Sequence, residues 1–416
     1  MVRSFGGIGR ILAQTWPALL AWYLAGAVVR ASVIALAAPI GPDNPLGALL
    51  LVPIAVLAQL VSYIGMFLVL RRALPGYRSQ ARGDVEFGGF RETVSEFVGV
   101  LLATIGPFFT LYAVIGLLSQ DLSDYARAAF RYAMDDPGRG FVVGASPLAF
   151  AVVVVAFVLR LLLKVLGRRL PRWVAIIEIY LEATWVFVAL TAINSLFGPL
   201  TKWINNRQVV QWWEGAREYL SSLWAPIRFA FESIDWATPV ALQLLILPLA
   251  WLLVAGIIYL RALGTVDEAA PLPERLTRRV GGLRIAPGLL RYRHLITGTW
   301  DEVGKPIVAS ARMVIGAGIR NLAIFLAAYG LLFAAGQWAL RGIYTLVGAH
   351  DLAFWWIADA GISGFLAAVV EPIRILLLAA AFDYCLRRWA ERRALVPEAP
   401  SPVSAPERIG TSHPSA

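Results

Sequence analysis

The chain has 416 residues and a formal net charge of +10, and 59% of its residues are apolar while only 15% are charged. Soluble domains carry roughly 25% charged residues, so this composition, with a mean hydropathy of +0.68, excludes an ordinary water-soluble domain. The single cysteine, Cys385, excludes a disulfide scaffold. The sequence contains no motif typical of a catalytic, metal or cofactor site. We therefore expect an all-α, polytopic helical membrane protein that is not an enzyme and holds no cofactor or metal.

Eight apolar runs are long enough to cross a hydrocarbon core of ~30 Å as helices. The first run is longer than the core of a cleaved signal peptide, so we expect it to remain as a span. We expect the eight helices to be arranged as four hairpins within one transmembrane domain over 1–393. The predicted spans are 11–29, 46–70, 97–118, 146–163, 173–197, 239–260, 321–340 and 361–386.

Basic residues concentrate in the segments that lie on one side of these spans, for example at Arg71–Arg72 and Arg387–Arg388. The positive-inside rule then places both the N-terminus and the C-terminus in the cytoplasm. Arg greatly outnumbers Lys, which is typical of a GC-rich bacterial genome, so we expect a bacterial cytoplasmic membrane. The inner loops are too short for a nucleic-acid-binding domain. The basic inner surface instead predicts association with anionic lipid of the bilayer.

Two outer segments, 121–136 and 198–238, mix aromatic and charged residues. Trp prefers the headgroup layer because its ring is apolar and its N–H needs a partner. We expect both segments to form amphipathic helices on the outer leaflet, either as a plain cover or as a docking surface for lipid or a membrane-protein partner. The Pro- and Ser-rich segment 394–416 is predicted to be a disordered cytoplasmic tail.

Charged residues within spans are costly and therefore mark structural or functional sites. Glu178 and Glu182 are four residues apart in the fifth run and share one helical face. Arg160 and Lys164 are spaced in the same way in the fourth run. In an antiparallel hairpin with its turn near Pro171, Arg160 lies level with Glu182, and Lys164 lies level with Glu178. We expect two structural ion pairs, with the deeper acid, Glu182, also a candidate for a transport path.

The last run contains Glu371, Pro372 and Arg374. Glu371 lies about ten residues, or ~15 Å of helix, from the predicted outer end of the span. Pro372 lacks an N–H group and tends to kink a helix. A charge pair beside a kink near the bilayer midplane is typical of transporter binding sites, so Glu371 and Arg374 are transport-path candidates. The alternative is a self-contained i,i+3 ion pair in an ordinary helix.

Two functions fit these patterns. The first is a permease-like or lipid-handling protein with a polar path near Glu182 and Glu371–Arg374, which requires a cavity that reaches these acids. The second is a non-catalytic membrane scaffold or accessory subunit of a cell-envelope complex, which requires a partner protein instead.

Reporter fusions test the predicted topology. Alkaline phosphatase folds only outside the cytoplasm, so a fusion within 121–136 should be active and a fusion within 71–91 should be inactive. Green fluorescent protein fused at the same positions should give the reverse pattern, because it fluoresces in the cytoplasm. Two fusions reporting the same side of the membrane would contradict the predicted topology.

Overall fold

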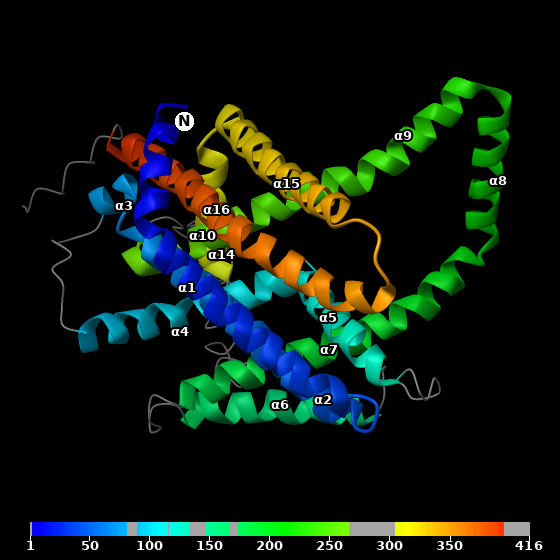
Figure 1. Ribbon diagram of the computed structural model, residues 1–416, viewed down its shortest axis with the longest axis horizontal. Helices are drawn as coiled ribbons and strands as arrows, with labels where there is room; N and C mark the ends of the chain where they lie inside the picture. The colour runs from blue at the N-terminus through cyan, green and yellow to red at the C-terminus, as the bar shows by residue number, and fades with distance from the viewer. Residues whose placement is uncertain are drawn as a thin grey trace, which may run out of the picture.

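The computed structural model describes residues 2–80, 90–114, 116–133, 147–166, 174–265 and 304–394, which form helices and short connections without a strand. The all-α prediction is thus confirmed for these residues. Long helices cross one another in a bundle from which α8 stands apart (Figure 1). The helices are α1 (Val2–Ile40), α2 (Pro45–Arg71), α3 (Pro75–Gln80), α4 (Phe90–Val114), α5 (Leu117–Ala133), α6 (Pro147–Leu166), α7 (Val174–Asn205), α8 (Gln208–Leu223), α9 (Ala225–Ala241), η2 (Leu242–Ile246), α10 (Leu247–Leu263), α14 (Lys305–Gly316), α15 (Ile319–Val347) and α16 (Leu352–Ala394).

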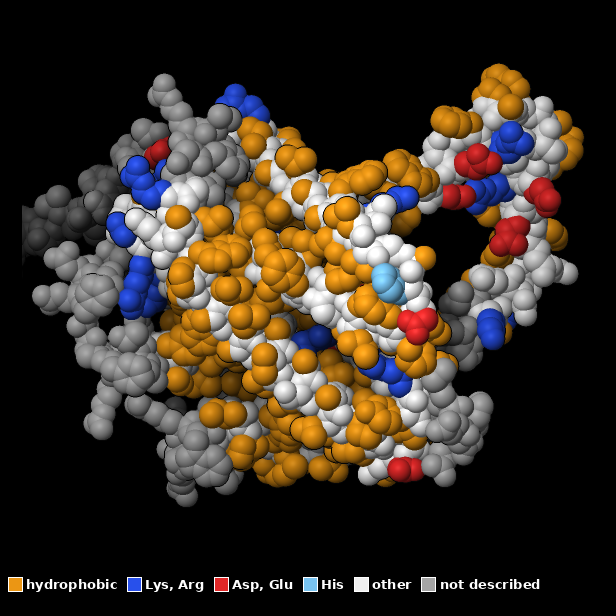
Figure 2. Space-filling view, in the orientation of Figure 1, with side chains coloured by type: hydrophobic (Ala, Val, Ile, Leu, Met, Phe, Trp, Pro, Cys, Tyr) orange, Lys and Arg blue, Asp and Glu red, His pale blue; other side chains and the backbone are white. Residues whose placement is uncertain are grey.

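Among the described residues, six helices are long and apolar enough to cross a membrane, which is compatible with a multi-pass membrane protein. Large apolar side chains remain exposed on them, and Figure 2 shows such side chains over the face formed by α1, α15 and α16. Exposure of such a large apolar surface is unfavourable in water but favourable in lipid. The six segments are Gly9–Ile40, Pro45–Arg71, Ile176–Ile193, Ala225–Leu263, Ile319–Val347 and Leu352–Arg393.

The eight regular spans predicted from the sequence are not confirmed. The run 97–118 does not form one straight helix, because Phe97–Ala113 and Leu117–Tyr132 are bent by 76° relative to each other and make at most a seventh span as a pair. Gly116 lies at this break with φ +87°, a conformation that residues with a Cβ rarely adopt. The run 146–163 forms only the shorter apolar helix Pro147–Leu163.

The arrangement as four hairpins is not confirmed either. Consecutive helices do pack together in places, among them α1 with α2, α6 with α7, and α15 with α16. However, α4 packs on α10, α2 and α7, and α8 and α9 lie between α7 and α10 along the chain. The predicted hairpins between the third and fourth runs and between the fifth and sixth runs are therefore replaced by other neighbours.

The centre of the bundle is formed by α2 and α10, whose side chains are buried on most sides. Both helices are apolar all round, as is typical of helices in a protein core or a membrane. Aromatic rings connect the layers, with the Tyr63 and Trp251 ring centroids 5.0 Å apart and those of Phe67 and Tyr259 5.8 Å apart. Tyr259 also donates a hydrogen bond of 3.1 Å to the carbonyl of Phe67. These contacts fix α10 against α2.

One buried carboxylate joins the C-terminal half of α16 to the short helix α3. The Asp383 side chain is only 1% exposed, accepts a 2.9 Å hydrogen bond from the N–H of Tyr77, and lies 3.1 Å from the Arg387 guanidinium. The contact satisfies a backbone donor at the start of α3, because the first N–H groups of a helix have no partner within it. The segment after α2 is thereby held against α16.

The predicted amphipathic segments are helical where the structure describes them, with α5 in the first and α8 and α9 in the second. No residue of α8 or α9 is buried. The two helices stand away from the bundle as an arm (Figures 1 and 2) and are joined by the Arg217–Asp235 ion pair. Trp212, Trp213 and Trp236 of the arm are at least 63% exposed. The predicted tail beyond Ala394 lies outside the described residues.

Glycine 256 provides a test of the central packing. A Cβ at Gly256 would lie 1.9 Å from the Ser310 hydroxyl oxygen and 2.6 Å from the Phe382 ring. Gly256→Val should therefore destabilise the protein by about 1–3 kcal/mol or more, as overpacking does, and lower its thermal denaturation midpoint in detergent. Gly342→Val is the matched control, because a Cβ there meets nothing within 4 Å. Equal midpoints for both variants would contradict the packing of α10 against α14 and α16.

Candidate functional site

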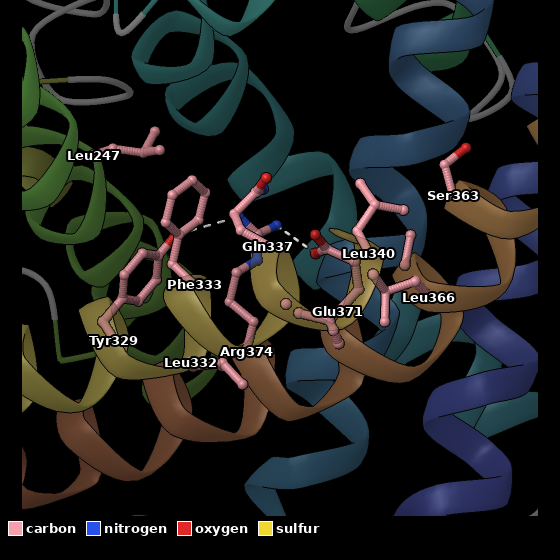
Figure 3. A pocket seen from close by; sticks show the side chains of 13 residues that line it. Leu247, Tyr329, Leu332, Phe333, Gln337, Leu340, Ser363, Leu366, Glu371 and Arg374 are labelled. Carbon is pink, nitrogen blue, oxygen red and sulfur yellow. Dashed lines mark hydrogen bonds and ion pairs between the residues drawn. The ribbon is translucent and has the colours of Figure 1, made fainter. Parts of the chain in front are cut away.

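A cavity of about 270 Å³ lies between α15 and α16, at the side of the bundle (Figure 3). Its walls are mostly aliphatic and aromatic, and a few polar groups are placed among them. The combination of apolar walls with a small number of polar groups is typical of ligand sites. The lining residues are Leu247, Tyr329, Leu332, Phe333, Gly336, Gln337, Leu340, Ser363, Leu366, Ala367, Val370, Glu371 and Arg374.

The helical repeat explains why these residues face one cavity. On each of the two long helices the lining positions recur every three or four residues, from Tyr329 to Leu340 on α15 and from Ser363 to Arg374 on α16. Each stretch covers eleven residue steps, or about 16 Å at 1.5 Å per residue. This length is about half of the ~30 Å hydrocarbon core. The cavity is therefore a groove about as long as one leaflet is thick.

The packing of α15 keeps the groove open. Only Asn321, Phe325 and Tyr329 of this helix are buried, so α15 touches the bundle along a narrow stripe in its first half. Gly336 follows two turns later, and a Cβ at this position would lie 3.7 Å from a methyl group of Val370. Because Gly336 has no side chain, the groove wall stays recessed there.

An ion pair forms the polar end of the groove. An Nη2 hydrogen of Arg374 is donated to Oε2 of Glu371 over 2.5 Å, within one turn of α16. The Tyr329 hydroxyl lies 3.5 Å from Nη1, and the Tyr63 hydroxyl lies 3.5 Å from Nη2. Figure 3 shows Tyr329, Arg374 and Glu371 in line along the groove. These charges lie near the middle of the 43-residue helix α16.

Aromatic rings hold the Arg374 guanidinium in place. Its central carbon lies 4.5 Å from the Trp251 ring centroid and 5.7 Å from that of Tyr63. A cation over an aromatic face is stabilised most where water is excluded. Nε of Arg374 is buried and has no hydrogen-bond partner among the described residues. The guanidinium is thus held by rings and keeps a donor without a partner.

The side chains beside this pair come from several helices. The rings of Tyr63 of α2 and Trp251 of α10 contact Arg374, and the Tyr329 hydroxyl of α15 lies 3.5 Å from its Nη1. The kink expected at Pro372 does not break the helix, since α16 continues through it from Leu352 to Ala394. The polar end of the groove is therefore built on rigid helices.

The other predicted charges lie in the α6–α7 pair. Nη2 of Arg160 is 2.9 Å from Oε1 of Glu182, and the two side chains are 13% and 22% exposed. The side chain of Lys164 lies outside the described residues, and so does its predicted pair with Glu178, which is half-buried on α7. Glu182 does not line the groove that Glu371 and Arg374 share. The three transport-path candidates therefore do not form one site.

A cluster of charges between α1 and α5 was not predicted from the sequence. Arg30 donates hydrogen bonds to Asp121 over 2.7 and 3.1 Å and to Asp124 over 2.5 Å. The Tyr112 hydroxyl donates a 2.7 Å hydrogen bond to the other oxygen of Asp121, whose side chain is 6% exposed. The signal was Arg30 within a continuous apolar stretch, because such a charge needs a partner. Its partners are more than ninety residues away and cannot be read from local spacing.

Among the described residues, no group of three or more His, Cys, Asp or Glu side chains could hold a metal ion. A second cavity, of about 220 Å³, lies at the bend between α4 and α5 and is bordered by Leu190 and Thr191 of α7. It contains no charged lining residue. No protein family model, curated protein or solved structure matches this chain.

Removal of Arg30 tests the α1–α5 cluster. Arg30→Gln should destabilise the protein by about 3 kcal/mol, because loss of one partner leaves a buried carboxylate uncompensated. Arg30→Gln combined with Asp121→Asn should recover part of this loss, and thermal denaturation in detergent measures both. Arg341→Gln, at an exposed position of α15, is the control. A double variant less stable than Arg30→Gln alone would contradict the pairing.

Proposed function

We propose that this protein handles a lipid within a bacterial cytoplasmic membrane, and that the groove between α15 and α16 holds that lipid. One observation carries the proposal, namely the elongated apolar groove with the Glu371–Arg374 ion pair at one end. A lipid has the matching shape and polarity, with an apolar chain and a polar headgroup.

The dimensions of the groove support a lipid over a small polar solute. Its length of about 16 Å, at 1.5 Å per residue, corresponds to an acyl chain extended through one leaflet. The walls at Leu332, Leu366 and Val370 offer such a chain dispersion contacts. A sugar or amino acid needs more hydrogen-bond partners than these walls contain. Of the permease-like and lipid-handling functions expected from the sequence, the groove therefore favours transport or presentation of a lipid.

The positions of the basic residues support the proposed membrane location and the proposed orientation of the helices. Arg71 ends α2, Arg261 is in the last turn of α10, and Arg392 and Arg393 are in the last turn of α16. The positive-inside rule assigns these helix ends to the cytoplasm. The N- and C-termini then lie on the cytoplasmic side, and the arm formed by α8 and α9 belongs to the outer side.

A second candidate function is a membrane scaffold, which the arm favours. Its side chains Trp212, Trp213 and Trp224 are exposed, and Trp is enriched at protein interfaces. Its charges occur in both signs, for example in the Arg228–Glu232 pair. A scaffold does not need the groove, so groove-filling variants separate the two functions.

Filling the groove tests the proposal. Gly336→Leu places four carbon atoms between α15 and α16 beside Val370. The amount of lipid that stays bound to the protein should therefore fall at least several-fold. Native mass spectrometry of the protein released from nanodiscs measures this amount. Gly342→Leu is the control, as it lies on the same helix in open space. Thermal denaturation of both variants checks that they remain folded.

The outcomes are distinct. Lipid loss in Gly336→Leu alone, with both variants folded, supports the lipid-handling function. Equal lipid retention by the wild type and both variants overturns it and leaves the scaffold as the remaining candidate.

A further inference from the structure

The polar end of the groove presents both signs of charge to a ligand. Glu371 and Arg374 both line the cavity, with side chains 22% and 15% exposed. Their charges cancel, so this pair gives the groove no net charge. The ligand that the groove takes must be compatible with this neutrality in an apolar environment.

Arg374 can bind an anionic group without leaving Glu371. Only Nη2 of Arg374 donates to the Glu371 carboxylate, and Nη1 reaches the Tyr329 hydroxyl at 3.5 Å, which leaves other Nη1 and Nη2 hydrogens over; Nε is buried and out of reach of a ligand. A guanidinium carries five N–H donors in a planar fork that matches phosphate oxygens. The remaining donors are therefore suited to a phosphate.

Glu371 can accept a cationic group at the same time. Its contact with Arg374 uses Oε2, whereas a carboxylate has two oxygens with about four acceptor positions. Its neighbour Gln337 lines the groove from α15 and adds an amide beside the pair. A primary ammonium group has three donors and suits such acceptors.

The net charge of a lipid headgroup decides whether it fits beside Glu371 and Arg374. A headgroup with a phosphate alone would leave one uncompensated negative charge beside Glu371, which is costly where the dielectric constant is low. A headgroup with one phosphate and one ammonium adds no net charge. Each of its charges then meets an opposite charge of the protein.

Resting on the proposed lipid-handling function, we propose that the groove is specific for zwitterionic phospholipid headgroups, with the phosphate on Arg374 and the ammonium on Glu371. Phosphatidylethanolamine represents this class. The specificity arises from the pairing of two opposite charges and not from the apolar walls, which any acyl chain fits.

A lipid competition experiment tests the headgroup specificity. The full-length protein is reconstituted in nanodiscs with equal amounts of phosphatidylethanolamine and phosphatidylglycerol, released into the gas phase, and analysed for bound lipid by native mass spectrometry. The wild type should retain phosphatidylethanolamine in about tenfold excess, because a like charge beside Glu371 costs at least this factor.

Two variants at the polar pair reverse or remove the preference. Glu371→Gln leaves a net positive charge, so the bound lipid should change to phosphatidylglycerol. Arg374→Gln removes the phosphate partner and should abolish retention of both lipids at this site. Arg341→Gln, outside the groove on α15, keeps the wild-type preference and total retention. Thermal denaturation of each variant shows whether it is folded.

The outcomes separate this inference from the proposed function. Lipid retained in the groove without a headgroup preference, or an unchanged preference in folded Glu371→Gln, overturns the zwitterion specificity and leaves the lipid function standing. No groove-dependent lipid in the wild type overturns both. Free glycerophosphoethanolamine, a phosphodiester whose single negative charge is balanced by its ammonium group, should not displace the lipid when it is added as a competitor. Displacement at equal concentration would assign the site to a soluble zwitterion and overturn the lipid function.

Discussion

The need to neutralise each buried charge organises this helical bundle. In lipid or a protein interior a single charge is costly, and an opposite charge with hydrogen bonds removes much of that cost. Arg30 of α1 meets Asp121 of α5, Arg160 of α6 meets Glu182 of α7, and Asp383 of α16 meets Arg387 and the backbone of α3. These pairs act as fixed points between helices whose apolar surfaces alone would pack in several registers.

The Glu371–Arg374 pair differs from the others in its surroundings. Its two members lie on one helix, and both line the groove between α15 and α16. Tyr63, Trp251 and Tyr329 hold the guanidinium from three other helices. Because α15 touches the bundle along only one short stripe, the pair opens to a groove and not to a packed interface. The proposed lipid binding and the proposed headgroup selection both depend on this opening.

Local periodicity accounts for the parts of the site that the sequence predicted. Glu371 and Arg374 are three residues apart, and the spacing alone places them together on a helix. Arg160 and Glu182 could be paired because they are equally far from one turn, and the structure places them 2.9 Å apart. The aromatic partners of Arg374 come from α2, α10 and α15. Their distance along the chain hid them from any argument based on spacing.

The amino-acid sequence by itself determined that the described chain is helical and apolar enough for a membrane. Hydropathy is a local property, and in lipid the backbone of each segment must form its hydrogen bonds within that segment. Only the tertiary structure decided that α4 and α5 bend sharply at Gly116, that Arg30 reaches Asp121, and that α15 leaves a groove against α16. These features depend on which helices become neighbours. That choice is made by the summed packing of surfaces distant in sequence, which no single segment encodes.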